Sequence, residues 1–358
     1  MLKIYSSLFL FFVFLGLKAQ SFPTDTLQIL FVGDIMSHGP QIKAAYNPQT
    51  KTYDYTENFK YLKPYFQQAD YVIGNLETTL GVLPYSGYPQ FSAPPALAQA
   101  CSDAGINVLA TANNHACDKH MYGIIHTIDV LDSLHIRHFG TYRHQTAADR
   151  LSPLWLQTKG IRLALLNYTY GTNGYSIPRP TKVNLIDTLA IKKDILKAQQ
   201  KNPDAIIVFL HWGQQYHDKP STRQKRLVNF FRKHGVNIVI GSHPHVIQPV
   251  DYERDYINSK DYLTAFSLGN FISNQRKFPR DGSLVLSLKF IKTKQGKLSL
   301  VQYDTLPVWV YKYRKHKQWH YEILPVEQFK LRPDFFVKNE DYQKMMRYYK
   351  HYLQLINP

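Results

Sequence analysis

The segment NIVIGSHPH (residues 237–245) has the pattern of a short buried strand that ends in two histidines. Strands ending in polar residues recur along the chain. In layered α/β proteins, ligands gather at the carboxyl ends of strands, where loops converge. The sequence therefore predicts an α/β fold with a site built from strand ends. Five further strands end in this way: LQILFV before Gly33-Asp34, YVI before Gly74–Glu77, INVLATA before Asn113–His115, AIIVFL before His211–Gly213, and LTAFSL before Gly269-Asn270.

These strand ends have a common chemistry. A single histidine after a strand is more often a structural residue than a ligand, and Asp after Gly is ordinary turn chemistry. Several consecutive strand ends that each offer Asp, Glu, Asn or His beside a small residue are harder to explain structurally. Nitrogen and oxygen donors without sulfur suit Zn, Mn or Fe. The sequence therefore predicts a site for one or two divalent metal ions.

The order of apolar strands and amphipathic helices along the rest of the chain also predicts a layered α/β fold. The apolar runs 161–166 and 205–210 have the character of strands that are buried on both faces. After about residue 246, strand-like segments at 262–267, 283–291 and 298–304 predict a second sheet. We expect one domain over residues 20–306 and a basic, aromatic C-terminal extension over 307–358. Helices are predicted at 94–104, 122–134, 188–200, 221–234 and 341–355.

Composition narrows the class of partner. The 358 residues are 44% hydrophobic and 14% aromatic, which excludes a disordered chain. The formal net charge of +17 favours anionic partners such as nucleic acid, a membrane surface or an acidic polymer.

The N-terminus indicates export. Lys3 precedes the apolar run Leu8–Leu17, and Ala19 is suited to the cleavage position. We therefore expect residues 1–19 to be a signal peptide. An uncleaved short anchor is the alternative, but the run falls short of the ~20 residues that cross a bilayer. We expect a periplasmic or extracellular chain without a transmembrane segment after cleavage, for which nucleic acid is not a partner.

At this level of detail the chain resembles a known family. Six motifs in the same order resemble those of the CapA proteins of poly-gamma-glutamate capsule synthesis, a branch of the calcineurin-like metallophosphoesterase superfamily. The resemblance implies a four-layer αββα sandwich with a metal centre between two sheets. The motifs are Gly33–Met36, Gly74–Thr78, Ala112–Asp118, His211–Gly213, Gly241–His245 and Ser267–Phe271.

The resemblance also implies roles for individual residues. His115 would be the general acid or charge stabiliser, and Asp118 would orient it. Glu77 would take the place of the carboxylate that bridges two ions. The full set of implied metal ligands is Asp34, Glu77, Asn114, His211, His243 and His245.

Three positions depart from the family pattern. One is His120, where many members have glycine, which affects the expected shape of the loop beside His115. Met36 stands where two-metal phosphoesterases carry a histidine, and His38 would compensate in part if the loop curls back. Gln215 stands where the family usually has a glutamate, so we expect it to hydrogen-bond substrate. Arg276, after the last motif, is expected to hold an anionic group.

Two functions remain open on these residues. One is an exported metal-dependent hydrolase in which activated water attacks a phosphoester or an amide of an anionic substrate, either a phosphorylated compound or an acidic polymer. The other is a non-catalytic envelope protein that binds an anionic polymer during capsule assembly or export, together with envelope assembly proteins. Met36 and Gln215 favour the second slightly, whereas the otherwise intact ligand set favours the first.

Overall fold

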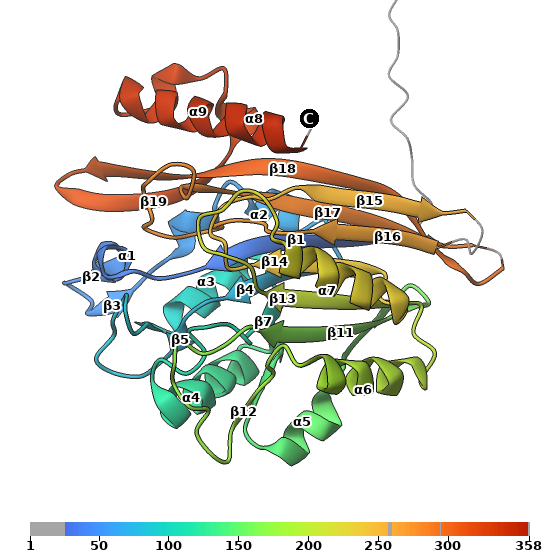
Figure 1. Cartoon of the computed structure of the whole chain (residues 1–358). Helices are drawn as coiled ribbons and strands as arrows, with labels where there is room; N and C mark the ends of the chain where they lie inside the picture. Colours follow the sequence, from blue (N-terminus) through green and yellow to red (C-terminus); the bar gives the residue numbers. More distant parts are fainter. Residues whose placement is uncertain (1–25, 257–259, 294, 357–358) are drawn as a thin grey trace, which may run out of the picture.

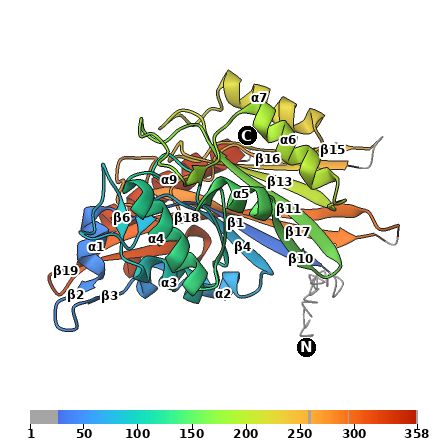
Figure 2. The same ribbon diagram turned by 90° about the horizontal axis from the view of Figure 1, so that it is seen from below.

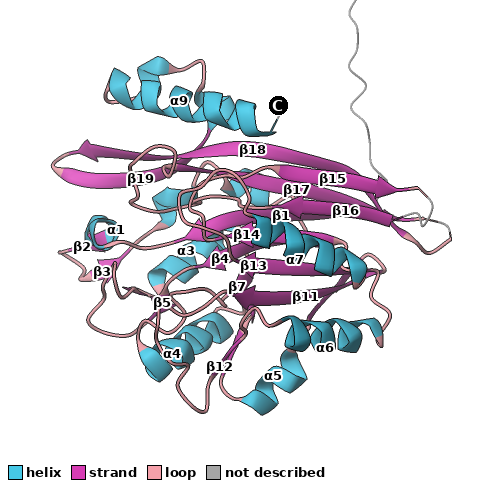
Figure 3. Ribbon diagram, viewed as in Figure 1, coloured by secondary structure: helices cyan, strands magenta, loops and turns pink. Residues whose placement is uncertain are grey.

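The computed structural model describes residues 26–256, 260–293 and 295–356, so the expected signal peptide at 1–19 lies outside the described residues. Two mixed β-sheets form the centre of the molecule, with helices around them (Figures 1 and 3). The α/β fold class predicted from the alternating pattern is confirmed.

The first sheet has seven strands and begins from the central strand β1 (Leu27–Ile35). On one side β1 runs parallel to β4, and β7 and β8 continue that half in parallel. On the other side β1 runs antiparallel to β17, and β18 and β19 extend the sheet. These strands are β4 (Tyr71–Leu76), β7 (Val108–Ala110), β8 (Arg137–Phe139), β17 (Gly282–Lys292), β18 (Leu298–Lys315) and β19 (Gln318–Pro325).

The second sheet has six strands in the order β10-β11-β13-β14-β16-β15. Its four central strands are parallel, and an antiparallel strand closes each edge. The strands are β10 (Leu154–Thr158), β11 (Ile161–Thr169), β13 (Ala205–His211), β14 (Ile238–Ser242), β15 (Val250–Asp255) and β16 (Lys260–Ala265).

Successive residues of a strand point to opposite faces of its sheet, and this alternation determines which layer each side chain packs against. In β1, Ile29 and Phe31 pack in one apolar cluster with Phe209 of the second sheet, so these faces of the two sheets meet. The intervening residues of β1 pack in a second cluster with helix α3 (Ala96–Ala104). On the second sheet, residues between the inward-facing ones pack with α6 (Thr188–Gln199) and α7 (Thr222–Lys233). Figure 2 shows these helices from below.

The predicted helices are confirmed to within a few residues, and local sequence explains their ends. Asp187 caps α6 by accepting hydrogen bonds from two backbone N–H groups of its first turn. Ser221 and Gln224 form a capping box at the start of α7. The other long helices are α4 (His120–Ser133) and α9 (Asn339–Ile356).

Several short elements were not predicted, because too few residues carry a periodic pattern. They are α1 (Gly39–Ala45), α2 (Lys63–Phe66), α5 (Gln145–Leu151), α8 (Val326–Phe329), the 3₁₀ turns Thr56–Phe59 and Pro333–Phe335, and the two-residue strands β2 (Tyr46–Asn47), β3 (Thr52–Tyr53), β5 (Thr79–Leu80), β6 (Ser92–Ala93), β9 (Thr141–Tyr142) and β12 (Lys182–Val183).

The C-terminal part continues the first sheet. The prediction that the strands after residue 246 form a sheet of their own is wrong: β17 pairs with β1, while β16 pairs with β14. The expected boundary at residue 306 lies inside β18. Beyond it, α9 lies over β18 (Figure 1) and buries Met345 and Tyr348 in the cluster that holds Trp309. Among the described residues, no helix is long and apolar enough to span a membrane.

Candidate metal centre

Polar side chains from both sheets meet at the carboxyl ends of the strands. Asp34 lies near the end of β1, and Glu77 follows β4. From the second sheet, His211 is the last residue of β13, and His243 follows β14. All four are at least 96% buried, so the site lies inside the molecule and not on an exposed loop.

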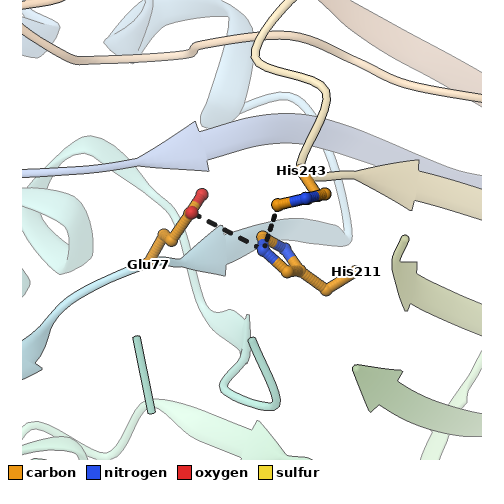
Figure 4. A group of neighbouring side chains, drawn as sticks. All are labelled: Glu77, His211 and His243. Atoms are coloured by element: carbon orange, nitrogen blue, oxygen red, sulfur yellow. Dashed lines mark hydrogen bonds and ion pairs between the residues drawn. The ribbon is translucent and has the colours of Figure 1, made fainter. Parts of the chain in front are cut away.

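The first group of donor atoms comprises Glu77, His211 and His243 (Figure 4). Nε2 of His211 lies 3.5 Å from Oε1 of Glu77 and 3.1 Å from Nδ1 of His243. The side-chain oxygen of Asn114 lies 2.7 Å from the same Nε2. Four residues from four separate strand ends therefore point at one small volume.

The second group comprises Asp34, Glu77 and His245. Nδ1 of His245 lies 3.0 Å from Oδ2 of Asp34, and its Nε2 lies 3.7 Å from Oε1 of Glu77. Glu77 thus belongs to both groups. The six expected ligands lie together, and Glu77 is placed where one carboxylate could serve two ions.

The electrostatics of the centre fit a divalent cation. Oε1 of Glu77 is buried without a hydrogen-bond partner among the described residues. Burial, and then the neighbouring charge of Asp34, raises the pKa of Glu77 well above its usual value. Burial also lowers the pKa values of His211 and His243, which keeps both rings neutral. Neutral imidazoles and a buried carboxylate oxygen without a hydrogen-bond partner in the described part of the chain are donors that a bound cation would stabilise.

A hydroxyl group orients the ring of His211. Oγ of Ser242 lies 2.9 Å from Nδ1 of His211 and donates its proton to the carbonyl of Leu210. The hydroxyl oxygen then accepts the Nδ1 proton, because a serine hydroxyl has only one proton to give. Nε2 is left with its lone pair and faces Glu77 and Asn114, as a metal ligand requires.

The backbone around the histidines is unusual. His243 and His245 adopt positive φ angles of 97° and 58°, which non-glycine residues rarely do outside turns and functional sites. Just before these histidines, Gly241 lets the backbone pass close to Phe266, since a Cβ there would lie 1.9 Å from the carbonyl oxygen of Phe266. Gly33 has the same function beside Asp34, where a Cβ would lie 2.0 Å from the carbonyl oxygen of Gly269.

His115 and Asp118 form the expected pair beside the centre. Nδ1 of His115 lies 2.7 Å from Oδ2 of Asp118, and both side chains are buried. The backbone N–H of Phe91 donates to the same carboxylate oxygen, and the ring of Phe91 packs edge-on against His115 at 4.6 Å. The imidazole is therefore held in one orientation, with Nδ1 occupied by the carboxylate.

A cavity of about 860 Å³ opens beside the centre. Its lining includes His115, His243 and His245 together with three predicted substrate-binding residues, His38, Gln215 and Arg276. His38 does not join either donor group: its Nδ1 accepts a hydrogen bond from the backbone N–H of Asn274. Met36 lines the same cavity, so the family histidine at that position has no imidazole replacement within the donor groups.

The basic residues at the mouth have different orientations. Nη1 of Arg276 donates to the carbonyl of Val310, and its guanidinium lies over the ring of Trp309, so Arg276 supports β18. Arg280 instead lies over the ring of Tyr216, at 3.2 Å from its centroid, and lines the cavity with Lys277. Sequence reasoning missed Arg280, because only the loop's conformation separates it from Arg276.

Sequence reasoning also missed Asn75. Its side-chain amide donates to Asp34 at 2.8 Å and lies 3.4 Å from Oε2 of Glu77. Its oxygen accepts a hydrogen bond from Asn113. The available signal was its position in the same motif as Glu77, near the end of β4.

Comparison with known proteins shows the family of the chain. Residues 28–275 match the family described as bacterial capsule synthesis protein PGA_cap. The chain is 26% identical over 295 residues to the PGA biosynthesis protein CapA of Bacillus subtilis (strain 168), covering 80% of this chain and 74% of that one. It is 29% identical over 263 residues to the capsule biosynthesis protein CapA of Bacillus anthracis, covering 70% of this chain and 61% of that one.

A solved structure shares the fold. The NAD nucleotidase NadN of Haemophilus influenzae superposes with a TM-score of 0.52 and 12% identity, covering 92% of this chain and 56% of the nucleotidase. At this identity the likeness concerns the fold alone. It agrees with the metallophosphoesterase-type α/β fold that the motifs imply.

Proposed function

Because this chain belongs to the PGA_cap family of bacterial capsule synthesis proteins, we propose that it is an exported metal-dependent hydrolase of capsule metabolism. It would cleave a phosphoester or an amide bond of an anionic substrate of the poly-gamma-glutamate type. The observation that carries the proposal is the place of Glu77, whose unpartnered Oε1 lies between two groups of buried donors.

The donor groups name the residues that would hold the ions. Asp34, Glu77 and His245 would hold one, and Glu77, Asn114, His211 and His243 would hold the other. A divalent ion bound there lowers the pKa of coordinated water and polarises the scissile group. Mn, Zn and Fe all suit this set of oxygen and nitrogen donors.

The chain's own residues would supply the proton. His115 lines the cavity, and Asp118 holds its Nδ1 at 2.7 Å. Nε2 is then the atom that can donate a proton to the leaving group. General acid catalysis of this kind contributes about 10²–10⁴-fold to the rate.

The mouth of the cavity would bind the anionic part of the substrate. Its lining contains Lys277 and Arg280, and no Asp or Glu of the described part of the chain lines it. Tyr216 holds the Arg280 guanidinium from one face, which leaves its edge N–H groups for carboxylate or phosphate oxygens.

One observation favours the second function, a non-catalytic polymer-binding protein of the envelope. Met36 is 98% buried beside the site and supplies no ligand where a histidine is expected. A centre short of one imidazole binds its ion less tightly. Such a protein would hold metal and polymer without turnover, alongside envelope assembly proteins.

Elemental analysis tests the proposal. We expect the purified mature chain to contain one or two equivalents of Mn, Zn or Fe, and Asp34→Ala and Glu77→Gln to lose metal while keeping the far-ultraviolet circular dichroism spectrum. Hydrolysis of an aryl phosphate and of a gamma-glutamyl amide then separates the two functions. Metal without turnover on either substrate would favour the binding protein, and a chain that binds no metal on titration would end both metal-based proposals.

Export is a separate part of the proposal. It rests on Lys3, the apolar run at 8–17 and Ala19. Expression of the full chain followed by cell fractionation and N-terminal sequencing tests it. We expect a mature N-terminus at residue 20 outside the cytoplasm, and an uncleaved N-terminus would contradict this.

A further inference from the structure

Two more cavities continue the cleft away from the metal centre. The 860 Å³ cavity adjoins one of about 200 Å³, and the two share Tyr170, Gly213 and Gln214 in their linings. The second adjoins a third of about 510 Å³, which lies between α6 and α7. The last two cavities share Ile186, Arg223 and Leu227. Because neighbouring cavities share lining residues, the three lie side by side, and together they are called the groove below.

The groove has basic side chains along its far part. Arg223 and Arg226 line the third cavity, and both are exposed on α7. They are three residues apart on the helix, so their side chains lie next to each other. Neither forms an ion pair among the described residues. Helix α7 contains five basic residues and no acidic one.

One acidic group offsets part of this charge. Among the described residues, Asp187 is the one carboxylate residue that lines the two outer cavities, against Arg223 and Arg226. Its Oδ1 accepts hydrogen bonds from the backbone N–H groups of Leu189 and Ala190, and the net charge of the lining stays positive. The groove is therefore positively charged from Arg280 at the mouth to Arg226 at the far end.

The remaining wall of the groove is apolar. Ile186, Leu227 and Phe230 line the third cavity between the arginines and α6. A ligand that contacts both this wall and the arginines carries apolar segments as well as negative groups. The mouth cavity alone has the volume of a typical small-molecule site. The two outer cavities therefore extend beyond what a single small substrate fills.

We propose that this groove binds an extended anionic polymer, with Arg223 and Arg226 holding carboxylates several units away from the bond at the metal centre. The ligand class is a flexible chain that carries one carboxylate on each unit and methylene groups between them. The inference rests on the proposed function, because it assumes that the bond to be cleaved lies at Glu77 and His115. The inference adds a second binding site, to which Glu77 and His115 do not contribute.

The test compares a long with a short ligand. The probes are poly-L-glutamate of about 50 residues and triglutamate, each labelled with a fluorophore, and fluorescence anisotropy gives the affinity for the metal-loaded protein. Loss of two exposed charge contacts is expected to weaken long-chain binding by about tenfold in Arg223→Gln/Arg226→Gln. Triglutamate binding is expected to be unchanged, because the mouth alone holds it.

A matched variant controls for net charge. Arg150→Gln/Arg332→Gln removes the same two charges from exposed positions that line none of the three cavities. We expect it to bind the long chain as the wild type does. The proposal would be wrong if long-chain binding weakened equally in both double variants, or if it did not weaken in Arg223→Gln/Arg226→Gln.

Two further measurements separate this inference from the proposed function. Metal content and hydrolysis of a small substrate should be the same in Arg223→Gln/Arg226→Gln and the wild type. If the protein hydrolyses neither test substrate, the proposed hydrolase is wrong, but the polymer-binding measurement still tests the groove. Anionic phosphatidylglycerol vesicles serve as the competing probe. Binding to vesicles that depends on these arginines, without length-dependent polymer binding, would assign the face to a membrane surface instead.

Discussion

The side-chain amide of Asn75 donates a hydrogen bond of 2.8 Å to Oδ1 of Asp34 inside the buried centre. Removal of this donor leaves a buried carboxylate oxygen without its partner, which costs about 1–3 kcal/mol. We therefore expect Asn75→Ala to lower the free energy of unfolding of the metal-free protein by that amount in urea titrations. Asn229→Ala, at an exposed position of α7, is the control and should change stability little. Equal stabilities of the two variants would contradict the structural importance of this contact.

The pair formed by His115 and Asp118 predicts a kinetic effect. Asp118→Asn cannot hold the imidazole as a carboxylate does, and His115→Asn removes the proton donor. If the chain is a hydrolase, His115→Asn should lower kcat by about 10²–10⁴-fold and Asp118→Asn by less. Neither residue belongs to the donor groups, so bound metal measured by elemental analysis should stay the same. A fully active His115→Asn variant would remove the general acid from this position.

His38 predicts a pH dependence of stability. Burial lowers its pKa from 6.5 to about 4. Between these values the unfolded chain binds a proton that the folded chain does not, so stability is lost as the pH falls from about 6.5 towards 4. The shift corresponds to a loss of up to about 3 kcal/mol.

A conservative variant isolates this contribution. In His38→Asn the amide oxygen can still accept from the N–H of Asn274, but the side chain no longer titrates. We expect urea denaturation between pH 7 and pH 4.5 to show a smaller loss of stability than in the wild type. His135→Asn serves as the control, because that histidine is exposed and has a left-handed backbone that asparagine tolerates. A wild-type pH dependence in His38→Asn would show that other groups cause it.

Helix α9 predicts a packing effect. Met345 is fully buried in the cluster that holds Trp309 of β18. Met345→Ala should lower the free energy of unfolding by about 2–5 kcal/mol, because a cavity remains where the side chain was. The exposed Lys350→Ala should change it by no more than about 0.5 kcal/mol. Thermal and urea unfolding of both variants measure the difference, and a small effect at Met345 would mean that α9 is not part of the core.

Local sequence patterns were enough to predict most helices and strands. The strand pairings were not predicted, because they depend on contacts between distant parts of the chain. Helix α7 could be predicted because Leu227 and Phe231 recur at helical spacing and Ser221 offers a cap. Nothing local shows that β17 pairs with β1, because the pairing joins residues more than 250 positions apart. The position of residue 306 inside a strand was not predictable either, since no residue near it shows that one strand continues across the expected boundary.

In the candidate site, too, local motifs could be predicted from the sequence and long-range contacts could not. The ligand types and their strand-end positions were visible in the sequence, because each motif is local. The importance of Asn75 depends on contacts with Asp34, which is 41 residues away. The choice between Arg276 and Arg280 depends on which guanidinium packs on Trp309 and which on Tyr216.

The pairing of β1 with β17 has a consequence for biosynthesis. The strand that carries Asp34 is among the first to leave the ribosome, and its antiparallel neighbour is among the last. Contacts between such distant segments slow folding, because a long loop must close first. We expect the nascent chain to stay without its finished first sheet until translation is nearly complete. The export that we propose would be helped by this delay, because a chain whose first sheet is unfinished can still pass through a narrow channel.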